Sequence, residues 1–356
     1  MYQCKEHNSS YRHYCDECCK TCDGHRKIWL GSWCGKNPSG HDLNNRFDTL
    51  RGSRGLKFDQ GGYGVCGLAC ALYVLLKHDM PSARELFEAT FHGYCKGLTA
   101  KKFKGADINL SDIPAFAKAD DLYFDPKAPN LVDTTMARVL GSLLKKKAPD
   151  RYQSEQGMKW DHVVRMSETE NWKMGNVPLR TNTLAYVLES ILGFSVSTIA
   201  FRDDCTPADK ERYMGPPLAI NITYAPYKTL QEFFDLYRLH AAYSTSYVFA
   251  GLKALEFVTS TDFGDNEDSQ LADYSPDKQD KQNPEALKRM NTLTDTTRRC
   301  GNDPYDHWVV VEKVVASPGN KVTLTLWTWG RQLSLRLSEA SFLHTVHDVI
   351  FGEIKP

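Results

Sequence analysis

The sequence predicts an α+β fold, because helical patterns fill the first half of the chain and strand patterns fill its end. The clearest helix is CGLACALYVLLK at 66–77, which is apolar on nearly all sides, as in a helix buried in a core. The clearest strands are HWVVVEKVV at 307–315 and VTLTLWTW at 322–329, with the turn-forming SPGN between them. We therefore expect a buried helix near residue 66 and an antiparallel hairpin near the end.

Weaker patterns add further elements between these two. Helices are predicted at 112–118 and 228–240. Three further helices have a predicted N-terminal cap: 82–91 with the capping box Ser82 and Glu85, 134–146 with Asp133, and 183–191 with Asn182. Apolar runs predict strands at 194–201, 218–224 and 332–338. The polar segment 259–299 is predicted to be a long loop.

Composition narrows the function classes. The 356 residues are 41% hydrophobic, which is enough for a proper core. Lys plus Arg equals Asp plus Glu at 44 each, so the net charge gives no sign of a nucleic-acid partner or of membrane-surface binding. No apolar run approaches the ~18 residues of a membrane span, and the N-terminus lacks a signal-peptide pattern. We expect a cytoplasmic protein, or an effector secreted by a route that needs no cleaved peptide.

The cysteines are distributed unevenly, and this divides the chain. Six of the eleven lie within residues 1–34, a clustering that indicates metal binding more than a disulfide scaffold. Residues 35–59, rich in Gly, Asn and Asp, are predicted to be a connector with little periodicity. Residues 60–356 form the predicted main domain.

Cys66 is the candidate nucleophile. It opens the apolar helix directly after GGYG, where the positive end of the helix dipole stabilises a thiolate and the glycine backbone can approach a substrate. Gln60 lies six residues earlier, and its amide can complete an oxyanion hole with the Cys66 N–H. His307, at the start of a predicted strand, is the candidate base. Cys70, one turn beyond Cys66, is expected to be a core residue.

These segments together resemble the papain-like cysteine peptidases. QGGYGVCGLAC looks like the nucleophile motif of that superfamily, Asp306-His307-Trp308 followed by valines looks like its histidine strand, and Trp329-Gly330 is similar to the strand end beside its active site. Gly215-Pro216-Pro217 resembles the strand entry of bacterial members, including bacteriocin-processing ones. The resemblance implies a catalytic helix packed on an antiparallel sheet, with Cys66 as nucleophile, His307 as base and Gln60 in the oxyanion hole. It also implies that strand 218–224 pairs near the His307 strand.

Two features depart from that family. The third catalytic residue, usually Asn or Asp, is expected two residues before Trp329, where Trp327 stands and can only donate a hydrogen bond. Thr325 or Thr328 could orient His307 instead, or the pair could work as a dyad. A large insertion also separates Cys66 from His307, and it is expected to build a specificity surface.

The N-terminal cluster has metal-ligand spacing. Pairs of Cys and His two residues apart can hold one tetrahedral ion, and zinc suits thiolate with imidazole. The expected zinc ligands come from the set Cys4, His7, Cys15, Cys18, Cys19, Cys22 and His25, with Cys34 and His13 as possible additions. The spacing resembles the opening of B-box zinc fingers and then shortens, which leaves one or two ions open. Such a unit can be a docking module or a structural clip.

The resemblance implies a peptidase or isopeptidase that acts on a protein substrate through an acyl-enzyme. An effector-like toxin with an inhibitor or immunity partner fits this expectation. A cell-wall amidase, or a glutamine deamidase or transglutaminase, would use the same Cys–His pair. A non-catalytic interaction protein that carries zinc is the remaining alternative.

Overall fold

The structure is a computed structural model. It describes residues 2–4, 9–11, 43–58, 65–95, 101–108, 129–156, 179–202, 214–241, 243–252, 271–273, 307–328 and 330–354. The chain divides into two compact units, Met1–Lys159 with Val164–Val177, and Trp160–Val163 with Pro178–Pro356. The first unit is mainly helical, and the second contains a large, mostly antiparallel sheet, as the predicted α+β class requires.

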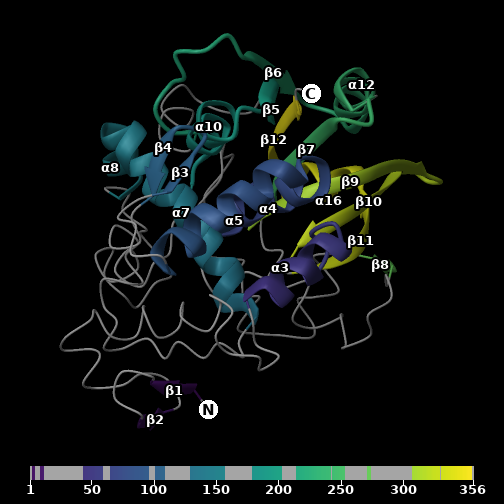
Figure 1. Ribbon diagram of the computed structural model, residues 1–356. Coiled ribbons are helices and arrows are strands. Elements are labelled where there is room, and N and C mark those ends of the chain that lie inside the picture. Colours follow the sequence, from purple (N-terminus) through teal and green to yellow (C-terminus); the bar gives the residue numbers. More distant parts are fainter. Residues whose placement is uncertain are drawn as a thin grey trace. The chain divides into compact units, whose positions relative to one another are not determined.

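Helix α4 is the centre of the first unit (Figure 1). It spans Cys66–His78, as the apolar run predicts, and all residues from Gly67 to Leu76 are buried. It contacts α5 (Met80–Cys95) and α7 (Pro129–Lys147). The unit also contains α3 (Leu43–Gly52) and α8 (Pro149–Gln156). Two small hairpins are formed by β1 (Tyr2–Cys4) with β2 (Ser9–Tyr11), and by β3 (Lys101–Phe103) with β4 (Ala106–Ile108).

Helix α3 falls within residues 35–59, the range predicted to be a connector. Its sequence, LNNRFDTLRG, has few apolar residues, and tertiary contacts hold it in place. Phe47 is buried against Phe87 of α5 with ring centroids 4.6 Å apart, and Leu50 is also buried. Arg46 forms an ion pair with Asp133 of α7.

The predicted helix caps of this unit are wrong. Helix α5 begins at Met80, and the cap is Asp79, whose carboxylate accepts from the Ser82 N–H at 3.1 Å. Glu85 accepts from the backbone of Lys104 in the β3–β4 hairpin instead of closing a capping box. Asp133, the predicted cap of helix 134–146, lies inside α7.

The sheet of the second unit has eight strands in the order β6-β5-β12-β7-β9-β10-β11-β8 (Figure 1). The β5–β6 and β8–β11 pairs are parallel and the others are antiparallel. The strands are β5 (Ser195–Arg202), β6 (Thr223–Tyr227), β7 (Ser246–Leu252), β8 (Leu271–Asp273), β9 (His307–Ser317), β10 (Lys321–Thr328), β11 (Arg331–Ser338) and β12 (Val346–Glu353).

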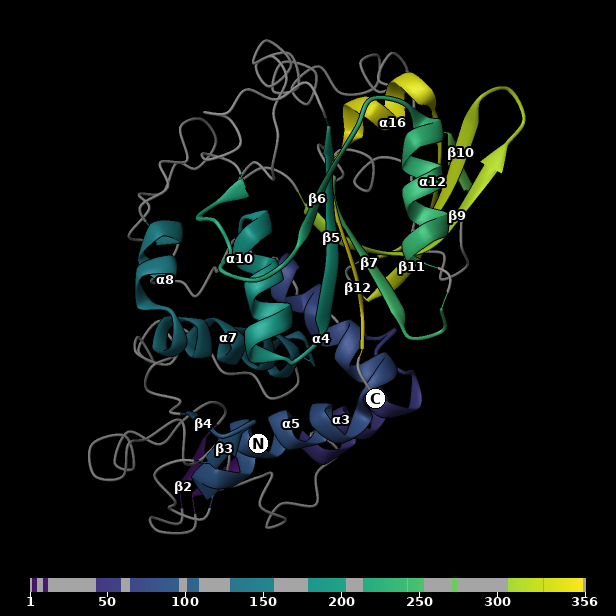
Figure 2. The same ribbon diagram turned by 90° about the horizontal axis from the view of Figure 1, so that it is seen from above.

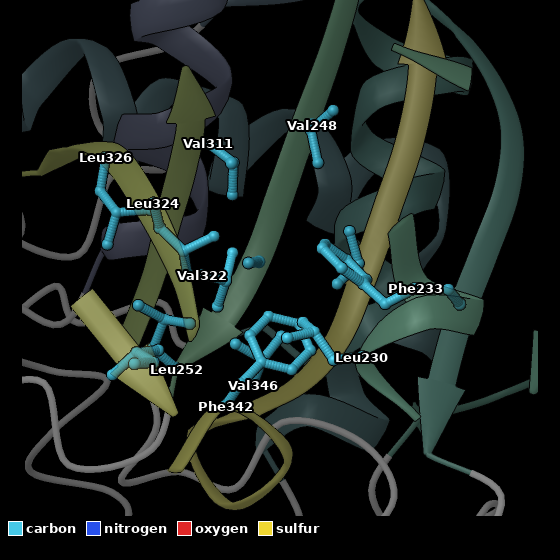
Figure 3. Close-up of a cluster of buried hydrophobic side chains, with 14 of the residues drawn as sticks. Leu230, Phe233, Val248, Leu252, Val311, Val322, Leu324, Leu326, Phe342 and Val346 are labelled. Atoms are coloured by element: carbon cyan, nitrogen blue, oxygen red, sulfur yellow. The ribbon is translucent and has the colours of Figure 1, made fainter. Parts of the chain in front are cut away.

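One face of this sheet carries a large apolar core, which Figure 3 shows in part. Helix α12 (Leu230–His240) and α16 (Glu339–Thr345) contribute to it and lie beside each other (Figure 2). Phe233 of α12 packs on Phe342 of α16 with ring centroids 4.7 Å apart. Leu252, the last residue of β7, brings the core to the end of that strand. Each such buried side chain contributes about 1.5–3 kcal/mol to folding.

The predicted hairpin is confirmed: β9 and β10 pair antiparallel, with Ser317 opposite Lys321 across a tight turn. The strands predicted at 194–201 and 332–338 correspond to β5 and β11. The predicted helix at 228–240 corresponds to α12, and helix 183–191 is formed by α10 (Thr181–Tyr186) followed by the π-helix η3 (Val187–Ile191). Arg180 is the N-cap of α10, so the expected cap at Asn182 is wrong.

The strand predicted at 218–224 is largely wrong. Strand β6 begins only at Thr223, because the preceding apolar residues are only partly covered and stay outside the ladder. Its pairing also differs from the expectation, since β6 is an edge strand beside β5 whereas β9 lies between β7 and β10. Pro226 is tolerated there because an edge strand leaves one row of N–H groups unused.

Some predictions lie outside the described residues. These are the helix at 112–118, the loop at 259–299 apart from β8, and the end of the second hairpin strand at Trp329. The predicted division into 1–34, 35–59 and 60–356 stays a prediction. Among the helices that the structure describes, none has both the length and the apolar character needed to cross a membrane.

Candidate active site

Cys66 is the first residue of α4, as the sequence predicts. Val65 is the N-cap, and its carbonyl accepts from the Ala69 N–H at 2.8 Å, which closes the first turn. Cys66 is partly exposed, whereas the helix behind it is buried from Gly67 onward. The N–H groups of a first helical turn point away from the helix, where they can donate to an external acceptor, and the helix dipole there favours an anion. Position and exposure thus suit a nucleophile.

Cys70 has the opposite environment. It lies one turn further along α4 and is 1% exposed. Burial raises the pKa of its thiol well above the usual value, and the nearby Cys66 adds to the rise. The expectation that Cys70 is a core residue is confirmed, so α4 offers one accessible thiol and one buried thiol.

His307 is the first residue of β9, in the centre of the sheet of the second unit. It is 4% exposed and lies directly opposite Leu252 of β7. Residues paired in this way share a face, so His307 lies on the face that carries the apolar core. The next residue, Trp308, therefore points to the other face, where its indole N–H donates to the Leu179 carbonyl at 2.9 Å. This bond anchors the start of β9.

The His307 ring has a hydroxyl partner on the neighbouring strand. Its Nε2 atom lies 2.6 Å from Oγ1 of Thr328, the last residue of β10. The sequence left Thr325, Trp327 and Thr328 open as partners, and the structure places Thr328 in contact. Trp327 is buried, and its backbone is paired with Val310. Thr325 lies further along β10, opposite Lys313.

Burial dominates the electrostatics of this imidazole. Desolvation lowers the pKa of His307 to about 3, because the charged form loses its hydration in an apolar environment. A hydroxyl carries no charge and compensates this loss only weakly. The ring is therefore neutral at physiological pH.

Most of the remaining predicted site residues lie outside the described part of the chain. Gln60 and the glycines that follow it lie outside the described residues. Cys66 belongs to the first unit and His307 to the second. Of the predicted zinc ligands, Cys4 ends strand β1, and the others lie outside the described part of the chain. Among the described side chains, no group of three or more His, Cys, Asp or Glu has an arrangement that could hold a metal ion.

Sequence reasoning missed two parts of the His307 environment. Strand β7 supplies Leu252, and its aromatic and β-branched run YVFA was a usable signal. The Leu179 carbonyl is a backbone group just before α10, and nothing in its sequence marks it.

Comparison of the chain with protein-family models, with curated protein sequences and with solved structures finds no match.

Proposed function

We propose that the protein is a papain-like cysteine hydrolase that cleaves a protein substrate, as a peptidase or isopeptidase. The observation that carries the proposal is the position of Cys66: a partly exposed thiol at the first residue of a helix that is otherwise buried. His307 supports it, since an imidazole at the start of a central strand is the second group that such chemistry needs. The proposal requires Cys66 and His307 to meet in the working protein.

The reaction would proceed in two stages. The Cys66 thiol gives its proton to His307, and the sulfur attacks the substrate carbonyl carbon to form a C–S bond. The oxyanion accepts hydrogen bonds from the Cys66 N–H and from the Gln60 amide. The C–N bond then breaks, and His307 returns the proton to the leaving amine. Water attacks the thioester with His307 as base, which frees the carboxylic acid and the thiol.

Alkylation of Cys66 tests the pair directly. The full chain, with zinc present to protect the N-terminal thiols, is treated with limiting iodoacetamide near pH 7.5, and labelling of the Cys66 peptide is followed by mass spectrometry. We expect His307→Ala to slow labelling about tenfold or more, because the base is lost. His240→Ala is the matched control, since His240 is also in the second unit and contacts a hydroxyl, Thr198 Oγ1 at 3.1 Å.

An equal labelling rate in wild-type protein and His307→Ala would contradict a catalytic Cys66–His307 pair and would favour a non-catalytic binding protein. Substrate class then follows from products. Cellular proteins, peptidoglycan and a glutamine-containing protein are each incubated with wild-type and Cys66→Ala protein. New N-termini indicate a peptidase, released wall peptides an amidase, and ammonia without cleavage a deamidase.

We also propose that the segment 1–34 binds structural zinc through its cysteines and histidines. The proposal rests on ligand spacing alone. Metal analysis of the purified full chain should find one or two zinc ions per chain, and Cys15→Ser with Cys18→Ser should remove at least one. A metal-free chain after purification in the presence of zinc would refute the proposal.

A further inference from the structure

Helix α4 carries two cysteines one turn apart in very different surroundings. Cys66 is its first residue and is partly exposed, whereas Cys70 is 1% exposed. Residues four apart lie on the same face of an α-helix, with their Cβ atoms about 5–6 Å apart. The two thiols also interact electrostatically: burial raises the pKa of Cys70, and the nearby Cys66 adds to the rise. An accessible sulfur therefore lies next to a protected one.

The two thiols should react with oxidants in a fixed order. Oxidation of a thiol follows its exposure and its thiolate character. Cys66 has both, because it is partly exposed and lies at the helix N-terminus, where the helix dipole favours an anion. Cys70 has neither, since it is buried and its pKa is raised. A hydroperoxide from the solvent therefore reaches and oxidises Cys66 first.

The first turn of α4 can close the remaining distance between the two sulfurs. A disulfide requires Cβ atoms about 3.5–4.5 Å apart, so Cys66 must move about 1–2 Å toward Cys70. The N-cap before Cys66 is Val65, whose apolar side chain cannot accept a hydrogen bond and hold the turn. Gly67 follows Cys66 and adds backbone freedom. The movement opens the bond from the Ala69 N–H to the Val65 carbonyl, and the rest of the helix keeps its place.

We propose that Cys66 and Cys70 form a reversible redox pair, in which Cys70 converts oxidised Cys66 into an intrahelical disulfide. The Cys66 sulfur attacks the terminal oxygen of a hydroperoxide, the O–O bond breaks, and the thiol proton goes to the departing alkoxide or hydroxide. The Cys70 sulfur then attacks the sulfenic sulfur, an S–S bond forms, and the hydroxyl leaves as water with the Cys70 proton. The two thiols together lose two electrons, and the peroxide gains them.

Proximity compensates for the weak nucleophilicity of Cys70. A thiol with a raised pKa reacts slowly in solution, but a neighbour held on the same helix face attacks in an intramolecular step. The bridge then prevents further oxidation of Cys66 to the irreversible sulfinic acid. The proposal goes beyond the proposed function, because it needs neither His307 nor a substrate. If Cys66 is the nucleophile, the same bridge stops hydrolysis until a dithiol reduces it.

One tryptic peptide reports the state of both sulfurs. Cleavage after Lys57 and Lys77 releases residues 58–77, whose only cysteines are Cys66 and Cys70. The full chain with zinc is treated with hydrogen peroxide, unfolded in excess N-ethylmaleimide without reductant, and digested. We expect the wild-type peptide to carry no maleimide and to be lighter by two hydrogen atoms. Dithiothreitol added before the maleimide should restore a peptide with two labels.

Cys70→Ala tests the resolving role. Without the second sulfur, Cys66 should proceed to sulfinic acid, and the loss of its thiol that dithiothreitol does not reverse should rise about tenfold or more. Cys95→Ala is the matched control, because it removes another cysteine of the first unit, at the end of α5, and keeps the pair. In Cys66→Ser, Cys70 should keep its maleimide label after peroxide, because burial protects it.

Three peptide masses would overturn the redox pair. The first is a wild-type peptide with Cys66 as sulfinic acid and Cys70 labelled. The second is a peptide lighter by two hydrogen atoms that carries one label, which is a sulfenamide of Cys66 with a backbone nitrogen. The third is a peptide with two labels after peroxide that fully oxidises glutathione.

The proposed function is tested by a different readout. The slowing of Cys66 alkylation in His307→Ala is measured without peroxide, so the redox pair and the catalytic pair can fail separately. Thermal unfolding verifies that the variants fold. Should Cys70→Ala not fold, the masses of the wild-type peptide decide the matter.

Discussion

Gly352 and Tyr247 are directly paired across β12 and β7, and a methyl group on Gly352 would overlap the Tyr247 hydroxyl. That hydroxyl donates to the Ser195 carbonyl of β5 at 3.1 Å and so connects strands on both sides of β12. The ladder bends at this place, because the β12–β5 register shifts between Phe351 and Gly352. Glycine is therefore required where the tyrosine passes over the central strand.

Gly352→Ala should destabilise the second unit by about 1–3 kcal/mol, because the added carbon overlaps Tyr247 and the Ser195 backbone. Tyr247→Phe should cost about 1 kcal/mol through the lost hydrogen bond. In the double variant the phenylalanine ring lacks the hydroxyl and relieves part of the overlap. The loss of stability in the double variant should therefore be smaller than the sum of the losses in the two single variants. Urea unfolding of the four proteins gives the coupling energy, and strict additivity would contradict the packing relationship.

Because His307 is buried as a neutral ring, we predict that the free energy of unfolding falls on mild acidification. Its folded pKa of about 3 lies below the unfolded value near 6.5, so the unfolded state takes up the proton first. The stability that the neutral ring provides is complete above pH 6.5 and is lost progressively toward pH 3. The loss from this one group amounts to about 2 kcal/mol by pH 5.

Unfolding curves of wild-type protein and His307→Gln between pH 7.5 and 5 measure this contribution. The glutamine cannot take up a proton, so the variant should lose less stability over this range. Parallel curves for the two proteins would show that His307 is not buried as a neutral ring.

We predict that loss of the ion pair between Arg46 and Asp133 strongly destabilises the first unit. The Asp133 side chain is fully buried, and Arg46 bonds it with two nitrogens, of which Nε lies 3.0 Å from Oδ1. Arg46→Met should cost about 3–5 kcal/mol, because it deprives a buried carboxylate of its opposite charge. Arg46→Met with Asp133→Leu should recover much of that loss. Thermal unfolding compares them, with Arg51→Met as the control, since Arg51 pairs with Asp48 on the exposed side of α3.

Thr229 predicts a smaller effect on α12. Its hydroxyl accepts from the Glu232 N–H at 3.2 Å, and the Glu232 carboxylate accepts from the Thr229 N–H at 3.2 Å, which forms a capping box. Thr229→Ala should cost about 1 kcal/mol, and Thr229→Ser should be nearly neutral. Hydrogen exchange of the first turn of α12 should rise in the alanine variant alone.

The sequence predicted elements whose own residues determine them. Helix 66–77 and the hairpin around Pro318 are of this kind, since an apolar run and a turn signal are local properties. Helix α3 and strand β6 depend on contacts from elsewhere: Arg46 needs Asp133 on α7, and the strand that includes Pro226 needs the ladder of β5. Strand β12 was missed because His347 and Asp348 interrupt its apolar run, although both are buried.

The candidate site shows the same division. The positions of Cys66 and His307 at the start of their elements follow from local sequence. The contact between His307 and Thr328 does not follow from local sequence. It depends on a β-bulge in the β9–β10 pair, where the register shifts between Thr325 and Leu326 and Glu312 is the extra residue of β9. A hairpin of the same residues without the bulge would turn the Thr328 side chain away from His307. No residue type around Glu312 marks the bulge, so the register could be known only from the paired strands.

The bulge at Glu312 also decides which changes of chain length the hairpin can absorb. Glu312 is the extra residue of β9, so its deletion would leave Thr325 opposite Lys313 and Leu326 opposite Val311 as consecutive pairs. His307 and Thr328 would therefore stay on one side of the sheet. A length difference of one residue at this point would leave the pairing of the flanking residues unchanged, whereas loss of the bulge with every residue kept would turn Thr328 to the other side.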